Sequence, residues 1–195
     1  MRRDIFWSAE PCDGFEHLSV AADGSGVVLD GLVVAEMAGR PLRLAYRIVC
    51  APDWCVRSLA IRHLDGDGRL ALQSDGRGSW QADDGHPVPE LAGAIDVDIR
   101  ATPTTNTLPI RRLRLAPGES GEIRVAYIDV PDLAARPVTQ RYTRLEDARG
   151  GARYRYESAT FRTDLEVDDE GFVIDYPGYW TRRGSTRPPA AEGAP

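Results

Sequence analysis

The sequence contains no lysine, because all 24 of its basic residues are arginine. This absence excludes chemistries that depend on a lysine amine. A Walker P-loop needs a lysine for its phosphates, Schiff-base enzymes need a lysine nucleophile, and the Ser-x-x-Lys motif of β-lactamases needs one as well. The composition is typical of drift in a GC-rich genome, so the missing lysine limits the chemistry without indicating a function.

Cysteine is scarce, with three residues, Cys12, Cys50 and Cys55. An odd number is a poor basis for a disulfide framework. A zinc site would need two cysteine pairs, or one cysteine pair with a histidine pair, whereas the three histidines are scattered along the chain. We therefore expect reduced thiols, no metal and no cofactor.

Long apolar runs are also missing. No segment approaches the ~20 apolar residues of a membrane span, and the N-terminus lacks the apolar stretch of a signal peptide. The net charge of −6 argues against a nucleic-acid-binding protein, which would need a basic surface. These absences predict a cytoplasmic protein with no membrane span and no nucleic-acid partner, and they leave the oligomeric state open.

What the sequence does contain is an alternation of apolar and polar residues, which is typical of strands with one buried face. The alternation is clearest at residues 42–50, and further examples lie at 95–99, 123–128, 153–157 and 161–167. Glycine-containing turn signals separate these short segments, a pattern that predicts an antiparallel sandwich, barrel or roll. We expect one mainly β domain over residues 1–183. A disordered tail over residues 184–195, rich in proline, alanine and glycine, should follow it.

One stretch, residues 104–115, breaks the alternation and favours a short helix over a strand. Thr105 or Asn106 is a suitable N-cap, and Pro109 suits a first helical turn because its missing N–H costs nothing there. A second, weaker helix candidate lies at residues 88–93.

The same stretch carries an unusual motif, Thr-Asn-Thr-Leu-Pro-Ile-Arg-Arg-Leu at residues 105–113, preceded by Asp-Val-Asp-Ile at 96–99. Together these residues resemble the signature of the putative glycolipid-binding family of bacterial proteins. Further matches spread over residues 6–183 and include Asp30-Gly31, Tyr46-Arg47, Gly76-x-Gly78-x-Trp80, Gln140-Arg141-Tyr142-Thr143, Tyr154-Arg155-Tyr156-Glu157-Ser158, Asp168, Gly171, Tyr176-Pro177-Gly178 and Arg182.

The resemblance implies a spiral β-roll, in which a many-stranded antiparallel sheet curls around one short helix. It also implies a glycolipid-like ligand. One departure is Thr104, where the family has an aromatic residue; a smaller side chain there is expected to enlarge or reshape an interior cavity.

We expect an amphiphile to lie between the curled sheet and the segment 105–115, where arginine and asparagine would meet its polar head and aromatic side chains its apolar part. The candidate ligand-binding residues are Arg111, Arg112, Asn106, Asp98, Tyr142, Tyr156, Trp54 and Trp80.

Each candidate also has a structural interpretation. Arg111 and Arg112 could hold an anionic headgroup, or pair with Asp96 or Asp98; as helix neighbours they point about 100° apart, so at most one faces a given site. Asn106 could cap the helix, and the aromatic residues could pack in the core. Asp96 and Asp98 lie on one face of a strand. Their carboxylates are either exposed to solvent or the acid and base of a glycosidase.

These observations favour a non-catalytic binding protein for a glycolipid-like or other amphiphilic ligand. The alternatives are an enzyme on a glycan or ester that uses Asp96 or Asp98 as acid or base, and a packed interaction scaffold without a ligand. An open apolar cavity above roughly 300 Å³ beside Arg111 or Arg112 would favour a binder. A packed interior with both arginines in ion pairs would favour the scaffold.

Overall fold

The structure is a computed structural model that describes residues 2–10, 13–37, 39–148 and 150–186. Its strands belong to one 14-stranded sheet. They are β1 (Arg2–Ala9), β2 (Gly14–Asp23), β3 (Gly26–Met37), β4 (Arg40–Cys50), β5 (Val56–His63), β6 (Arg69–Ser74), β7 (Trp80–Ala82), β8 (Asp96–Ile99), β9 (Ser120–Ile128), β10 (Ala135–Ala148), β11 (Gly151–Ser158), β12 (Phe161–Asp168), β13 (Val173–Tyr176) and β14 (Trp180–Thr186).

The order of the strands in the sheet is β7-β6-β5-β4-β3-β2-β1-β14-β13-β12-β11-β10-β9-β8. The chain therefore begins in the middle of the sheet, meanders outward to β7, crosses to the far end at β8 and returns to finish beside β1. The predicted many-stranded sheet is confirmed, and it is curled and open rather than closed into a barrel.

The sheet is antiparallel except where β8 pairs with β9 in parallel. This exception departs from the expected antiparallel sheet and has a simple cause. Parallel neighbours cannot be joined by a tight hairpin and need a crossover connection. Here the crossover contains the helix α1 (Thr107–Leu113), which lies between β8 and β9 in the sequence.

The helix predicted within residues 104–115 is confirmed as α1, preceded by a 3-10 turn, η2 (Thr104–Asn106). A second 3-10 turn, η1 (Pro89–Leu91), falls within the weaker candidate at 88–93. The helix ends at Leu113 because Arg114 adopts a left-handed conformation with φ of 50°. None of the helices within the described ranges has the length and apolar character needed to span a membrane.

The predicted helix cap is wrong. Asn106 precedes α1 in a helical conformation, and its side chain makes no cap bond. The reason is that η2 runs directly into the helix, so the backbone N–H of Thr107 already bonds to the carbonyl oxygens of Thr104 and Thr105. The side chain of Asn106 is therefore available for another contact.

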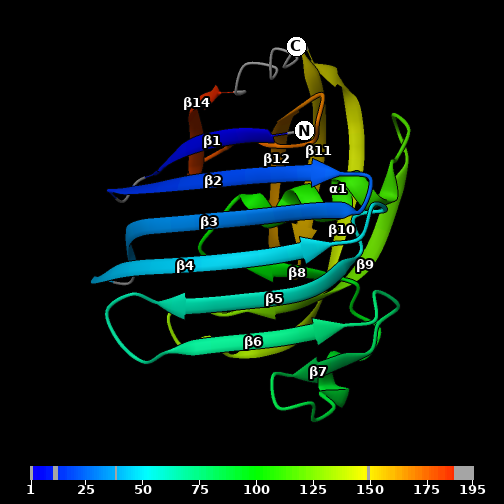
Figure 1. The fold of residues 1–195 in the computed structure, drawn as a ribbon. Coiled ribbons are helices and arrows are strands. Elements are labelled where there is room, and N and C mark those ends of the chain that lie inside the picture. Colours follow the sequence, from blue (N-terminus) through cyan, green and yellow to red (C-terminus); the bar gives the residue numbers. More distant parts are fainter. Residues whose placement is uncertain (1, 11–12, 38, 149, 187–195) are drawn as a thin grey trace, which may run out of the picture.

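Two layers of the curled sheet enclose α1. Figure 1 shows β1–β7 as one layer and β10–β12 crossing behind it, with α1 and β8 between them. The larger core cluster joins the inner face of the first layer to Leu108 and Ile99, and the smaller cluster packs Ile110 against Tyr142 and Tyr154 of the second layer. The helix therefore contributes to both clusters.

Two of the motifs singled out in the sequence are explained by the pairing of β3 with β4. Gly31 lies opposite Tyr46, and a Cβ atom at Gly31 would come within 1.9 Å of the Tyr46 ring, so only glycine fits beneath that ring. The neighbouring pair, Asp30 and Arg47, forms a cross-strand ion pair of 2.8 Å on the exposed face.

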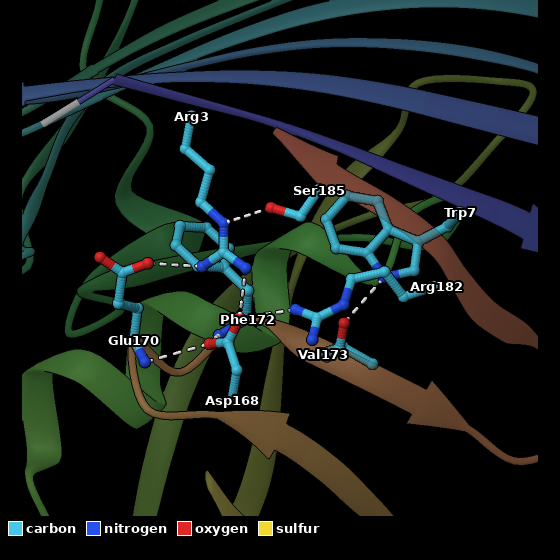
Figure 2. Close-up of polar contacts among 8 residues, drawn as sticks. All are labelled: Arg3, Trp7, Asp168, Glu170, Phe172, Val173, Arg182 and Ser185. Carbon is cyan, nitrogen blue, oxygen red and sulfur yellow. Dashed lines mark hydrogen bonds and ion pairs between the residues drawn. The ribbon is translucent and has the colours of Figure 1, made fainter. Parts of the chain in front are cut away.

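Buried and partly buried ion pairs join the first strand to the last part of the chain (Figure 2). Asp168 accepts hydrogen bonds from the guanidinium groups of Arg3 at 2.7 Å and Arg182 at 2.5 Å. Arg3 also donates to Glu170 at 2.5 Å and lies over the ring of Phe172 at 5.3 Å. We call these five residues the terminal clasp.

The sequence pattern placed the boundary between the domain and the tail at residue 183. Strand β14 includes residues 184–186, which the sequence pattern assigned to the tail, and these residues pair with β1. Residues 187–195 of the predicted tail lie outside the described part of the chain.

Candidate ligand-binding site

A cavity of about 380 Å³ lies between β8–η2 and the strands β9–β14. Six aromatic side chains line it, Tyr127, Tyr156, Phe161, Tyr176, Tyr179 and Trp180, and we call it the aromatic cavity. Its polar lining includes Asp98, Asn106 and Arg136.

Four of the rings form a continuous cluster. The ring centroid of Tyr156 lies 5.9 Å from that of Phe161 and 6.4 Å from that of Tyr176, and Tyr176 lies 5.0 Å from Tyr179. The hairpin turns between β11 and β12 and between β13 and β14 bring these residues together. Tyr179 is 47% exposed, which places it at the mouth of the aromatic cavity.

Asp98 is held in the aromatic cavity by neutral donors. Its Oδ1 accepts a hydrogen bond from the Thr105 hydroxyl at 3.1 Å, and its Oδ2 accepts one from the Gln140 amide at 2.6 Å and a long one from the Tyr156 hydroxyl at 3.5 Å. Burial raises the pKa of Asp98, and these hydrogen bonds oppose the rise. Among the described residues no arginine forms an ion pair with it.

Asp96, the other carboxylate of β8, has a different environment. Arg112 donates to both of its oxygens, most closely from Nε to Oδ1 at 3.0 Å and from Nη2 to Oδ2 at 2.6 Å. Asp96 is fully buried, so the interpretation of Asp96 and Asp98 as a solvated face is wrong. The physical reason is that β8 lies inside the roll, where Val97 and Ile99 face the main core and the two carboxylates face α1 and the second layer.

Arg111 and Arg112 diverge, as expected of neighbours on a helix. Arg112 follows the structural interpretation, since it pairs with Asp96. The guanidinium of Arg111 lies over the ring of Trp54 at 5.0 Å and lines a second cavity of about 720 Å³. That cavity is not the apolar one expected beside the arginines, because its lining includes Arg114, Arg144 and several aspartates.

The remaining predicted residues are divided between the aromatic cavity and the core. Tyr142 is buried behind the cavity and donates its hydroxyl to Asn106 Oδ1 at 2.8 Å, which fixes that amide. Trp54 packs in the core against Phe172, and Trp80 is buried with its indole N–H bonded to the carbonyl of Ala94. The structure thus brings Asp98, Asn106 and Tyr156 into one cavity.

Glu16 is a buried acid that the sequence analysis did not identify. It accepts hydrogen bonds from the hydroxyls of Tyr46, Thr102 at 2.6 Å and Thr104 at 2.8 Å. Burial raises its pKa to about 7, against the opposing effect of those hydrogen bonds. The sequence alternation could have indicated its burial, because Glu16 is two residues before Leu18 and therefore lies on the same apolar face of β2. Thr104, the departure from the family pattern, is therefore one of the donors to this acid.

The cysteines and metal-ligating residues form no second site within the described ranges. Cys50 and Cys55 are free thiols, and Cys12 lies outside the described residues. In the part of the chain that the structure describes, no group of three or more histidine, cysteine, aspartate or glutamate side chains is placed to hold a metal ion.

Comparison with known proteins links the whole roll to a family. The family model described as "Putative glycolipid-binding" matches residues 4–182. The crystal structure of a DUF1089 family protein from Pseudomonas aeruginosa aligns with a TM-score of 0.75 and 37% sequence identity, covering 89% of this chain and 94% of that chain. No curated protein matches the sequence.

Proposed function

Because the chain belongs to the putative glycolipid-binding family, we propose that its aromatic cavity binds the sugar headgroup of a glycolipid-like amphiphile without altering it. The observation that carries this proposal is a carboxylate, Asp98, that has no cationic partner among the described residues and is fixed beside a cluster of aromatic rings. Ligand pockets typically combine apolar and aromatic walls with a few oriented polar groups, in volumes of roughly 300–1,000 Å³.

The chemistry of the lining suits a sugar. A carboxylate accepts hydrogen bonds from hydroxyl groups, and its bonds to Thr105 and Gln140 hold Asp98 in one orientation. Burial raises the pKa of Tyr156, with a further contribution from Asp98, so that its hydroxyl remains a donor. The faces of Tyr176 and Phe161 offer stacking surfaces for the C–H faces of a sugar ring.

The alternative of a glycan hydrolase has less support. Such an enzyme needs two carboxyl groups at the substrate, one as acid and one as base or nucleophile. Asp98 lines the aromatic cavity, whereas both oxygens of Asp96 are bonded to Arg112. The pair considered from the sequence is therefore divided between two environments.

The test is a titration of the protein with alkyl glycosides that have the same alkyl chain and differ in the sugar, such as octyl glucoside and octyl maltoside, below their micelle concentrations. Asp98→Asn removes the charge and keeps the shape, so it should weaken binding by about tenfold to a hundredfold, the range for a hydrogen bond to a charged group. The matched control is Asp65→Asn, at an exposed carboxylate that pairs with Arg43. Equal binding by Asp98→Asn and wild type, or no binding of any glycoside by wild type, would contradict the proposal.

A further inference from the structure

A third hollow lies on the outer face of the first layer, away from the aromatic cavity. It has a volume of about 550 Å³, runs across β2–β6, and we call it the outer trough. Alanines form part of its floor: Ala60 lies opposite Ala71 in the β5–β6 register, and Ala45 of β4 lies diagonal to Ala60, opposite Arg62. Leu32, which is 40% exposed, forms part of its wall.

Small side chains create this hollow. An exposed sheet face normally carries long polar residues that cover the backbone, whereas three alanines on neighbouring strands leave a depression with an apolar surface. The inner face of the same strands is packed in the main core. The outer trough shares no lining residue with the aromatic cavity.

Two arginines lie opposite each other at one end of the outer trough. Arg62 of β5 pairs with Arg69 of β6 in the sheet register, and both side chains are exposed. Like charges directly opposite each other on neighbouring strands are destabilising. The third arginine of the trough lining, Arg47, is paired with Asp30. Within the described ranges neither Arg62 nor Arg69 forms an ion pair or a hydrogen bond with a side chain.

We propose that the outer trough binds a single-chain amphiphile with an anionic headgroup, whose oxyanion lies between Arg62 and Arg69 and whose alkyl chain lies along the alanine floor. Guanidinium groups bind carboxylate, sulfate and phosphate oxygens bidentately, and an oxyanion between the two arginines would relieve their repulsion. A headgroup alone would leave the apolar floor exposed to water. An alkyl chain that covers the floor removes this apolar surface from water, which favours binding.

The probes are laurate and decanoate, titrated below their micelle concentrations into the full-length protein. Arg62→Gln/Arg69→Gln should weaken laurate binding at least tenfold, because it removes both guanidinium groups. Each methylene added to the chain should strengthen wild-type binding about twofold to fourfold. Dodecanol, which has the same chain and no charge, should bind more weakly than laurate and respond little to the double variant.

Two controls distinguish binding in the outer trough from binding elsewhere on the protein. Arg141→Gln removes an exposed arginine from β10 and should leave laurate binding unchanged. Asp98→Asn should also leave laurate binding unchanged, whereas the double arginine variant should leave alkyl glycoside binding unchanged. The proposals for the outer trough and for the aromatic cavity can therefore be rejected independently. Ala60→Leu partly fills the outer trough and should weaken the binding of both laurate and dodecanol.

Three results would overturn the proposal. The first is laurate binding that the double arginine variant does not weaken. The second is equal affinity for laurate and dodecanol. The third is binding to anionic phospholipid vesicles without binding of monomeric laurate, which would make this face a membrane-docking surface instead.

Discussion

The carboxyl of Glu16 lies in the interior among three hydroxyl groups, and burial raises its pKa from 4.5 to about 7. Between these two values the native state binds a proton that the unfolded chain has released. Stability therefore falls as the pH rises through this window and becomes independent of Glu16 above it. From pH 5 to pH 8 this single group should reduce the free energy of unfolding by about 2 to 3 kcal/mol.

Replacing Glu16 by glutamine should remove this pH dependence. The amide is neutral at every pH, and it can accept hydrogen bonds from Thr102 and Thr104 as the protonated acid does. Relative to that of wild type, the free energy of unfolding of Glu16→Gln should rise by about 2 to 3 kcal/mol on going from pH 5 to pH 8. Urea denaturation at four pH values measures this gain.

The exposed acid Glu36 provides the control, since Glu36→Gln should follow the pH dependence of wild type. Parallel stability curves for Glu16→Gln and wild type would show that Glu16 does not hold the proton.

At the scale of the element, the bidentate pair of Arg112 and Asp96 fixes α1 to β8. Arg112→Leu leaves a fully buried carboxylate without its partner, which should cost about 3 to 5 kcal/mol. The double variant Asp96→Leu/Arg112→Leu should recover much of that loss, because no charge is then left buried.

A double-mutant cycle from chemical denaturation measures the coupling. The exposed pair of Arg43 and Asp65, 2.7 Å apart, is the control cycle, and its coupling should stay below about 1 kcal/mol. If the coupling energy of the buried pair is no larger than that of the exposed pair, the buried pair does not anchor the helix.

Several elements of this fold could be predicted because they follow local rules. Segment 42–50 alternates and forms part of β4, and the stretch that breaks alternation contains α1. The absence of a side-chain cap at Asn106 could not be predicted, because it depends on a preceding 3-10 turn whose carbonyl oxygens already bond the backbone N–H of Thr107.

The candidate site was predicted less completely. What could not be predicted is which distant residues contact each site residue, because that depends on the tertiary fold. Asp98 lies in the aromatic cavity and Asp96 in an ion pair, although both point from one face of β8, because one lies near Gln140 and the other near Arg112. Sequence period assigns residues to a face, but it does not state what covers that face when β8 lies inside a curled sheet.

At the scale of the whole molecule, the pairing of β1 with β14 connects the two runs of strands in the sheet order, β1–β7 and β8–β14. The main core cluster contains residues of both runs, such as Leu44 and Ala126, so the runs share one interior. Small domains with a shared core usually unfold in one cooperative transition. We expect the same here, with coincident curves by tryptophan fluorescence and far-ultraviolet circular dichroism.

Asp168 of the terminal clasp tests this cooperativity. Asp168→Asn leaves Arg3 and Arg182 without their shared counter-ion, and Arg3 is only 7% exposed, so the free energy of unfolding should fall by about 3 kcal/mol. Because the shared core still joins the two runs of strands, the variant should keep one transition with a lower midpoint, by both probes. Asp65→Asn, at an exposed ion pair, should change stability by less than about 1 kcal/mol. Separate transitions for the two probes in Asp168→Asn would instead mean that the clasp, and not the core, makes the roll one cooperative unit.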